Sequence, residues 1–436
     1  MNQQKDIIRD ARVLGMPKML LLGLQHMFAM FGATILVPIL VNSYFQSTSQ
    51  VLSVQVTLFC AGFGTLFFHL CTKFKVPAFL GSSFAFLGGF SSVAALDTGI
   101  FANMADKEKL QYACGGIVVA GLLYLILALI IRCVGVKRVM RFLPPVVTGP
   151  IIICIGLSLA PSAVSNASTN WLIAIVALAV IIIFNIWGKG MFKIIPILLG
   201  VVISYVFALV LQGLGFTNPD GSVILNFSGV SSAAVVGLPP FILPKFNLTA
   251  ILIMAPIAIA TMMEHIGDIS AISATVGQNF IEDPGLHRTL IGDGIATSIS
   301  AMIGGPANTT YGENTGVLEL SRVHDPKVVR LAACYAIVLS FIPKVAEIIA
   351  SMPASIIGGV SFILYGMISA IGVRNVVENH VDFTKSRNLI IAGAILVSGL
   401  GFSDGLTFTI GSTSITLTSL AIAAIAGIVL NAILPG

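Results

Sequence analysis

Three long stretches of the chain carry no charged side chain. Residues 19–72, 142–188 and 405–436 contain no Asp, Glu, Lys or Arg. An apolar run of about 20 residues is long enough to cross a bilayer as a helix. The 436 residues are 56% hydrophobic and only 9% charged, whereas soluble domains average about 25% charged residues. These features predict a polytopic membrane protein. They exclude a cytosolic enzyme, a nucleic-acid binder and a secreted disulfide scaffold.

Apolar runs separated by Pro, Gly and charged clusters predict an all-α fold with fourteen membrane spans. In the first half the spans fall near residues 17–42, 51–72, 76–95, 110–132, 140–160, 168–188 and 192–212. In the second half they fall near 246–271, 286–303, 306–321, 328–350, 352–373, 386–402 and 411–434. The segment 213–245 is rich in Gly and Pro and is expected to form the longest loop, which connects the two halves.

The distribution of positive charge predicts the orientation of these spans. With the N-terminus in the cytoplasm, all but four of the 23 Lys and Arg fall in inside loops or at adjoining span ends. The exceptions are Lys107, Lys109, Lys245 and Lys344. Because cytoplasmic loops of membrane proteins are enriched in Lys and Arg, both termini are expected in the cytoplasm.

The two halves of the chain resemble each other. The third span begins at Pro77 and the tenth at Pro306, and aligning these prolines places Phe84 opposite Glu313. The fifth and twelfth spans repeat one Pro-to-Gly spacing, Pro144 to Gly149 and Pro353 to Gly358. A duplicated unit of seven spans must enter the membrane in opposite orientations. The sequence therefore predicts seven-plus-seven inverted repeats, which are typical of secondary transporters.

Spans 3 and 10 are poor continuous helices. Residues 76–81 and 305–310 combine a proline with small or β-tolerant residues, and helical character resumes only after them. Each is interpreted as a short extended segment that leads into a half-helix. Extended backbone at membrane depth needs protein or a water-filled site to satisfy its polar groups. Two such segments at corresponding positions indicate a binding site.

Carboxylates inside predicted spans are the first candidates for chemistry. Inserting an ionisable side chain into a membrane span costs at least ~2.5–3.5 kcal/mol of free energy on insertion scales. Each such carboxylate therefore suggests a function. Glu264 lies in the middle of span 8 and Asp268 follows one helical turn later. The two charges repel, so one of them could hold a proton, as a proton-coupled carrier requires. The alternative is a carboxyl permanently hydrogen-bonded to a neighbouring helix.

Other candidates surround the predicted half-helices. Glu313 follows Gly312 at the start of the second half-helix, where backbone N–H groups lack helical partners. Phe84 could stack on a planar ring or pack in the core, and His26 in span 1 could be a site residue or a buried histidine. Asp293 is interpreted as structural rather than proton-conducting.

The remaining histidines and motifs suggest no further chemistry. The histidines at loop edges are expected to be solvated: His69, His287, His324 and His380. No GxxxxGK[ST] segment for ATP, no HExxH and no Gly-x-Ser-x-Gly occurs in the sequence. The six cysteines form no CxxC pair and no Cys/His cluster. We therefore expect no enzymatic activity, no cofactor and no metal.

At the tenth span the sequence resembles the signature of the nucleobase–ascorbate transporter family. Residues 308–317 (NTTYGENTGV), followed by Ser321-Arg322, are the core of this resemblance. It extends to 24–34 (LQHMFAMFGAT), 77–86, 264–267 (EHIG), 283–288 (DPGLHR) and 364–366 (LYG). It therefore covers nearly the whole chain.

The resemblance implies a uracil–proton symporter of the cell membrane. Spans 1–4 and 8–11 (residues 1–135 and 246–350) would form a core domain. Spans 5–7 and 12–14 (136–245 and 351–436) would form a gate domain through which the protein forms a homodimer.

The resemblance also implies roles for individual residues. Glu264 and Glu313 would accept hydrogen bonds from the ring N–H groups of uracil. The backbone amides of Phe84 and Gly312 would donate to its carbonyl oxygens. The other predicted pocket residues are Tyr311 and Ser83 in its lining, Tyr365 from the gate side and His26 through water.

Two positions bear on substrate and coupling. Purine and ascorbate carriers tend to have Gln where Glu313 stands, so the acid favours a pyrimidine. Some family members have His where Asp268 stands, which leaves open whether Asp268, Glu264 or Glu313 couples the proton. A xanthine or broader nucleobase permease is the alternative within the family. An anion transporter or channel is disfavoured by acids in the presumed site, and no nucleophile–base pair supports an intramembrane enzyme.

Overall fold

Long apolar helices make up most of the computed structural model, which describes residues 7–45, 50–403, 405–410 and 413–435. In the first half the main helices are α1 (Met16–Tyr44), α2 (Val54–Cys71), α3 (Leu87–Ala94), α4 (Asp106–Val134), α6 (Pro145–Ser158), α7 (Ala160–Ser168), α8 (Trp171–Trp187) and α10 (Pro196–Gly213). In the second half they are α12 (Leu248–Met254), α13 (Ile257–Val276), α14 (Leu286–Met302), α15 (Gly312–Ser321), α16 (Pro326–Ser340), α17 (Pro343–Ala350), α18 (Ala354–Glu378), α19 (Ser386–Gly401) and α20 (Ser419–Ile433).

Short elements connect these helices. They include the single turns α5 (Val136–Val139) and α9 (Met191–Ile194), and α11 (Ser228–Ser232) within the long Gly- and Pro-rich segment. Turns of other helical types lie at Ala11–Leu14, Gly99–Phe101 and Ile281–Gly285.

Within the described residues, seven helical segments are long and apolar enough to cross a membrane, or eight if the bent pair α16–α17 counts as one span. The protein is therefore a mostly helical, polytopic membrane protein. Helices α8, α19 and α20 are apolar but shorter.

Two of the predicted spans differ from continuous helices. The segment 328–350 consists of α16 and α17, which are bent by 87°. Pro343 lies at the start of α17, and a proline disfavours helical geometry in the residue before it, so the first helix ends there. The last predicted span begins as a strand, because β4 (Thr413–Leu417) pairs with β3 (Leu406–Ile410) in an antiparallel hairpin before α20.

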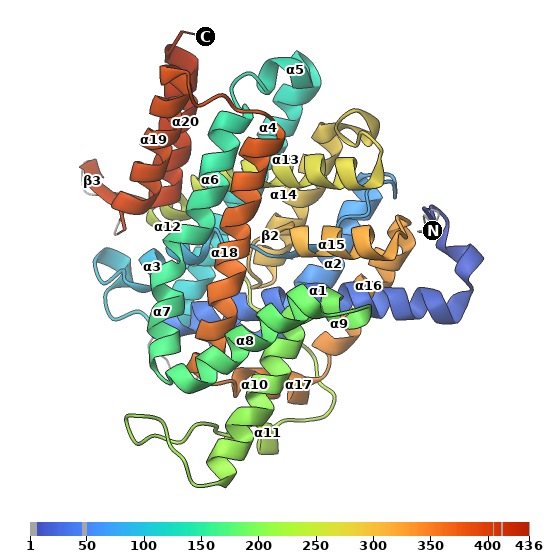
Figure 1. The fold of residues 1–436 in the computed structure, drawn as a ribbon. Helices are drawn as coiled ribbons and strands as arrows, with labels where there is room; N and C mark the ends of the chain where they lie inside the picture. Colours follow the sequence, from blue (N-terminus) through green and yellow to red (C-terminus); the bar gives the residue numbers. More distant parts are fainter. Residues whose placement is uncertain (1–6, 46–49, 404, 411–412, 436) are drawn as a thin grey trace.

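The helices pack in two groups (Figure 1). Helices α1, α2, α4, α14 and α16 contact one another in one group, with α14 against both α2 and α4. In the other group α18 packs against α6, α7 and α8, and α19 packs against α6 and α20. Helix α13 contacts members of both groups, α4 and α6.

The centre of the fold is a two-stranded antiparallel sheet. Strands β1 (Leu80–Ser82) and β2 (Asn308–Thr310) pair with Gly81 opposite Thr309. Helix α3 follows β1 and α15 follows β2, as predicted for the two extended segments and their half-helices. All six strand residues are buried. The pairing brings segments more than 200 residues apart in sequence to the same point.

Candidate functional site

The start of α15 lies at the central strand pair. The amide of Tyr311 donates to the carbonyl of Phe79 at 2.9 Å, which extends the pairing of β1 with β2 up to the residue before the helix. On the other strand, the amide of Ser83 donates to the carbonyl of Ala307 at 2.8 Å. The chain is thus held extended until Gly312, where α15 begins with its first backbone amides free of helical partners.

Two cavities meet the beginning of α15. A cavity of about 360 Å³ is lined by residues of α13, α15, α18 and α6. A second cavity of about 200 Å³ is lined by α1, α10, α15 and α18. Gly312 lines both of them, Asp268 lines the first and Glu313 the second. The larger cavity is in the range of small-molecule sites.

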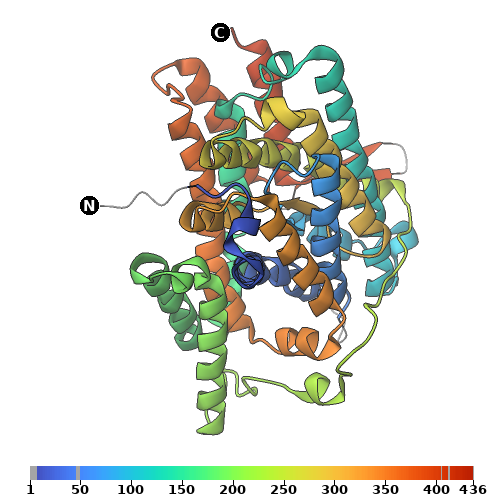
Figure 2. The same cartoon turned by 90° about the vertical axis from the view of Figure 1, so that its right-hand side faces the viewer.

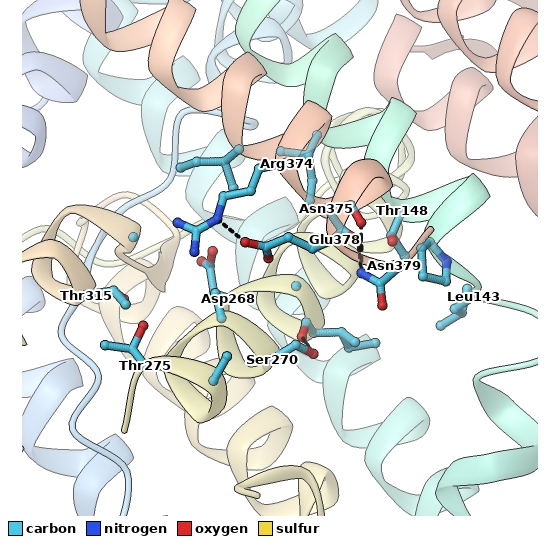
Figure 3. Close-up of a pocket in the computed structure, with 18 of the residues that line it drawn as sticks. Leu143, Thr148, Asp268, Ser270, Thr275, Thr315, Arg374, Asn375, Glu378 and Asn379 are labelled. Carbon is cyan, nitrogen blue, oxygen red and sulfur yellow. Dashed lines mark hydrogen bonds and ion pairs between the residues drawn. The ribbon is translucent and has the colours of Figure 1, made fainter. Parts of the chain in front are cut away.

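Asp268 is fixed by one hydrogen bond from the strand. The hydroxyl of Thr310 donates to Oδ2 of Asp268 at 2.8 Å. The side chain is otherwise directed toward the larger cavity, as Figure 3 shows. A carboxylate with one fixed partner and a free oxygen beside a cavity can accept a further hydrogen bond or a proton.

Glu264 lies one turn before Asp268 on α13. Its Oε2 is buried and has no hydrogen-bond partner among the described residues. It is close enough to Asp268, Asp293 and Glu313 for their charges to interact. The site therefore gathers acidic groups from α13, α14 and α15, and Glu264 retains unused capacity to accept a hydrogen bond.

The opposite wall of the larger cavity comes from α18 and α6. Near the end of α18, Nε of Arg374 donates to Oε1 of Glu378 at 2.6 Å. Asn375 and Thr148 line the same wall, and in the view of Figure 3 the Arg374–Glu378 pair is drawn between them and Asp268. The cavity thus lies between α13 and α15 on one side and α18 and α6 of the second packing group on the other.

An aromatic pair joins the loop between β1 and α3 to α18. The rings of Phe84 and Tyr365 are 5.9 Å apart between centroids, with an interplanar angle of 76°. This is the edge-to-face geometry that aromatic pairs favour. Both side chains are buried, and the hydroxyl of Tyr365 and that of Ser83 have no hydrogen-bond partner among the described residues. The pair connects the loop after β1 with the wall of the second packing group.

Tyr311 and His26 support the half-helix by bonding to neighbouring segments. The hydroxyl of Tyr311 donates to the carbonyl of Ser82 at 2.8 Å, across the strand pair. Asn314 in the first turn of α15 donates from Nδ2 to the carbonyl of His26 at 2.9 Å. His26 Nδ1 lies 3.2 Å from the same Nδ2 atom. His26 therefore contacts α15 on the side of α1.

Asp293 has a partner on the neighbouring helix. Its Oδ2 lies 3.1 Å from Nδ1 of His265, and both side chains are fully buried between α13 and α14. This arrangement is compatible with the structural interpretation of Asp293. His265, the residue after Glu264 on α13, thus has its polar partner on α14.

Sequence reasoning assigned no role to several residues of this site. Thr310 and Asn314 stood inside the recognised motif, but their partners lie on other helices. Arg374 and Glu378 form an ion pair at the end of α18, and the sequence suggested no role for either of them. Two of the histidines expected to be solvated, His69 and His324, are instead buried. Nε2 of His69 bonds to the carbonyl of Ala78 at 2.8 Å, so it supports the segment before β1.

The fold and the site define a membrane transporter: a polytopic helical protein with a substrate-sized cavity at the start of a half-helix. The sequence profile of the permease family matches residues 17–408. The chain belongs to this family, so its resemblance to the nucleobase–ascorbate transporters is confirmed.

Curated relatives extend over essentially the whole chain. A uracil permease of Bacillus caldolyticus is 40% identical over 100% of this chain and 96% of its own length. A uracil permease of Bacillus subtilis (strain 168) is 42% identical over 95% of this chain and 92% of its own. These relatives are transport proteins and not enzymes, in agreement with the expectation from the sequence.

Solved structures with low sequence identity share the fold. The transmembrane domain of the cyanobacterial bicarbonate transporter BicA superposes with a TM-score of 0.62 at 16% identity, covering 97% of this chain and 100% of that one. The murine anion transporter Slc26a9 superposes with a TM-score of 0.65 at 10% identity, covering 99% of this chain and 72% of that one. At these identities the likeness concerns the fold alone.

Proposed function

We propose that the protein imports uracil across the cell membrane by proton symport. The observation that carries this proposal is the cavity at Gly312, which has carboxylates on both sides of the start of α15 and the unpartnered carboxylate of Glu264 behind it. Uracil permeases that are 40% and 42% identical over 100% and 95% of the chain support the substrate. Acidic groups at the site suit a neutral ligand with N–H donors better than an anion.

The proposed recognition matches each polar atom of the base with one group of the site. Uracil has two ring N–H donors and two carbonyl acceptors. Glu264 and Glu313 accept from the donors, and the backbone amides of Phe84 and Gly312 donate to the carbonyls. The uracil ring is buried against Phe84 and Tyr365, which supply apolar contact. The edge-to-face pairing of these two aromatic rings supports their place in the pocket.

The remaining site residues complete the pocket. Ser83 and Tyr311 line it, and His26 contributes through water. The bonds of Tyr311 to Ser82 and of His26 to Asn314 support positioning roles for these two residues, because both brace the segment that carries Gly312 and Glu313.

Proton coupling is proposed to use the acidic residues beside the base. A proton taken up by Glu264, Asp268 or Glu313 relieves the repulsion among neighbouring carboxylates and favours uracil binding. Return of the empty carrier requires loss of that proton. The exposure of Asp268 to the larger cavity supports its role in proton exchange.

The proposed architecture has fourteen spans in seven-plus-seven inverted repeats, with both termini cytoplasmic and membrane lipid around the outer helices. Residues 1–135 and 246–350 form the core domain, and 136–245 and 351–436 form the gate domain. The position of the larger cavity between α13 and α15 on one side and α6 and α18 on the other supports this division. The homodimer forms through the gate domain.

Uptake of labelled uracil into proteoliposomes tests this function. An inward proton gradient is imposed, with a protonophore and excess xanthine as controls. Concentrative uptake that collapses with the protonophore and is unaffected by xanthine is the expected result. Absence of uracil uptake, or competition by xanthine, would move the assignment to another nucleobase.

A further inference from the structure

The segment before α1 lies along the loop that ends α15. We call residues 7–15 the N-terminal strap. The amide of Ile8 donates to the carbonyl of Arg322 at 2.9 Å, and the amide of His324 donates to the carbonyl of Ile8 at 2.8 Å. The amide of Ala11 donates to Oδ2 of Asp325 at 2.8 Å. Figure 2 shows this segment against α15 and α16. The strap therefore holds the end of the half-helix opposite to Gly312.

A cavity of about 610 Å³ lies between the strap, the loop before β1, the end of α13 and the start of α16. It shares no lining residue with the two cavities at Gly312. Four of its side chains are cations and two are carboxylates. The cations are Arg9, Lys75, Lys327 and Arg330, and the carboxylates are Asp283 and Asp325.

The two lysines are already paired with the carboxylates. Nζ of Lys75 lies 2.5 Å from Asp283, and Nζ of Lys327 lies 3.3 Å from Asp325. Arg9 and Arg330 form no ion pair with any residue that the structure describes. The guanidinium of Arg330 stacks over the ring of Phe74, 4.8 Å from its centroid, which fixes its plane. The cavity thus has two guanidinium groups free for an anion.

A buried histidine lies in the same wall. His324 is only 5% exposed, and neither of its ring nitrogens has a hydrogen-bond partner within the described part of the chain. Burial lowers the pKa of His324, and the positive charges of Arg9 and Arg322 lower it further. The backbone carbonyls of Leu318 and Val276 raise this pKa. The ring therefore lies at the cavity wall close to two carbonyl acceptors, and a phosphate oxygen that enters the cavity would compete with them for the imidazole N–H.

We propose that this cavity binds a phosphate group, held by Arg9, Arg330 and His324. Guanidinium groups bind phosphate oxygens with two parallel hydrogen bonds, and the third donor comes from the imidazole. The volume leaves room for more than a bare phosphate, so the group belongs either to a free phosphate compound or to the headgroup of an anionic lipid. Binding links the strap to α16 and so stiffens the end of α15 that the strap contacts.

The test measures thermal unfolding of the purified full chain in detergent. Inorganic phosphate or uridine monophosphate is titrated in one arm and phosphatidylglycerol in the other, with ionic strength held constant by sodium chloride. A ligand that binds the folded state raises the unfolding temperature in a saturable way. Saturation in the first arm supports a free phosphate compound, and saturation only in the second supports a lipid headgroup.

Variants assign the effect to this cavity. Arg9→Gln and Arg330→Gln are each expected to weaken binding about tenfold, the effect of losing roughly one charge-assisted hydrogen bond. Arg138→Gln removes the same charge from the exposed turn α5 and should leave binding unchanged. If a variant is not monodisperse, His324→Gln provides an independent test that keeps both arginines. No saturable stabilisation in either arm, or equal stabilisation in the cavity variants and in Arg138→Gln, would overturn the proposal.

Discussion

The hydroxyl of Thr310 donates a hydrogen bond to Oδ2 of Asp268 at 2.8 Å and joins β2 to the middle of α13. Thr310 is the last residue of its strand, and Gly312 begins the half-helix two residues later. One bond therefore fixes the position of a carboxylate relative to the backbone amides at the start of α15. The site is positioned by an extended segment on one side and a long helix on the other.

Loss of this bond is expected to impair transport. Thr310→Val keeps the side-chain shape and removes the donor. Asp268 then loses its hydrogen bond from Thr310, and a hydrogen bond to a group that can be charged contributes about 1.5–3 kcal/mol. We expect initial uptake of uracil to fall at least about tenfold. Thr310→Ser retains the hydroxyl and serves as the control. Equal uptake by the Val and Ser variants would contradict a positioning role for this bond.

Glu264 is expected to be indispensable for uptake. Glu264→Gln keeps the volume of the side chain and removes its charge and its ability to exchange a proton. Uptake should fall more than about 100-fold, equivalent to roughly 2.7 kcal/mol or more, while the variant remains folded. Labelled uptake and the unfolding temperature are measured together.

The matched control for this substitution is Glu282→Gln. Glu282 is exposed and lies outside both cavities at Gly312. The Glu282→Gln variant should transport uracil at the wild-type rate. Wild-type uptake by Glu264→Gln would remove this residue from the proposed mechanism.

Transport is expected to depend on the absence of a side chain at position 312. A Cβ at this position would lie 3.3 Å from Cδ1 of Ile371 and 4.0 Å from Oδ1 of Asp268, within the cavity that the base is proposed to enter. Gly312→Ala should therefore reduce uptake about tenfold or more, the equivalent of roughly 1.4 kcal/mol of lost binding. The effect should appear mainly in KM.

Gly316→Ala is the control on the same helix. A Cβ at Gly316 would meet no heavy atom within 4 Å. Alanine there should also favour the helix slightly, so uptake is expected to stay near that of the wild type. Gly316 also lines both cavities, so equal losses in the two alanine variants would mean that added volume along α15, and not access to the backbone of Gly312, limits transport.

Local patterns in the sequence were sufficient to predict the secondary structure around the site. Pro77 and Pro306 lack an N–H donor and begin extended segments, and the structure has β1 and β2 beginning three and two residues after them. The bend between α16 and α17 also has a local signal in Pro343, which hydropathy averaging concealed. The hairpin of β3 and β4 was missed because an uncharged apolar segment fits a membrane helix by composition, although its strand residues include several β-branched side chains.

The partners of the site residues could not be predicted in this way. Thr310 and Asp268 are 42 positions apart, and Asn314 and His26 are 288 positions apart. Such contacts depend on how the helices pack and have no local periodicity. The burial of His324 has the same origin, because the N-terminal strap covers the loop on which it lies.

The close contact of α4 with α14 is expected to determine stability. A Cβ at Gly294 would lie 2.6 Å from the carbonyl oxygen of Gly121, and a Cβ at Gly121 would lie 2.5 Å from the carbonyl oxygen of Gly294. Small residues let membrane helices approach this closely, and a larger side chain must force them apart. Gly121→Val should therefore destabilise the protein by about 1–3 kcal/mol, which is measured as a lower unfolding temperature in detergent.

The control for this stability prediction is Gly393→Val on α19. Gly393 is exposed, and a Cβ there would meet no heavy atom within 4 Å. The same substitution introduces the same β-branched residue into a helix, so its cost in helix propensity is matched while the steric overlap is absent. A drop in unfolding temperature at Gly121→Val that clearly exceeds that at Gly393→Val assigns the loss to helix packing. Equal drops would mean that the α4–α14 contact adapts to the added volume.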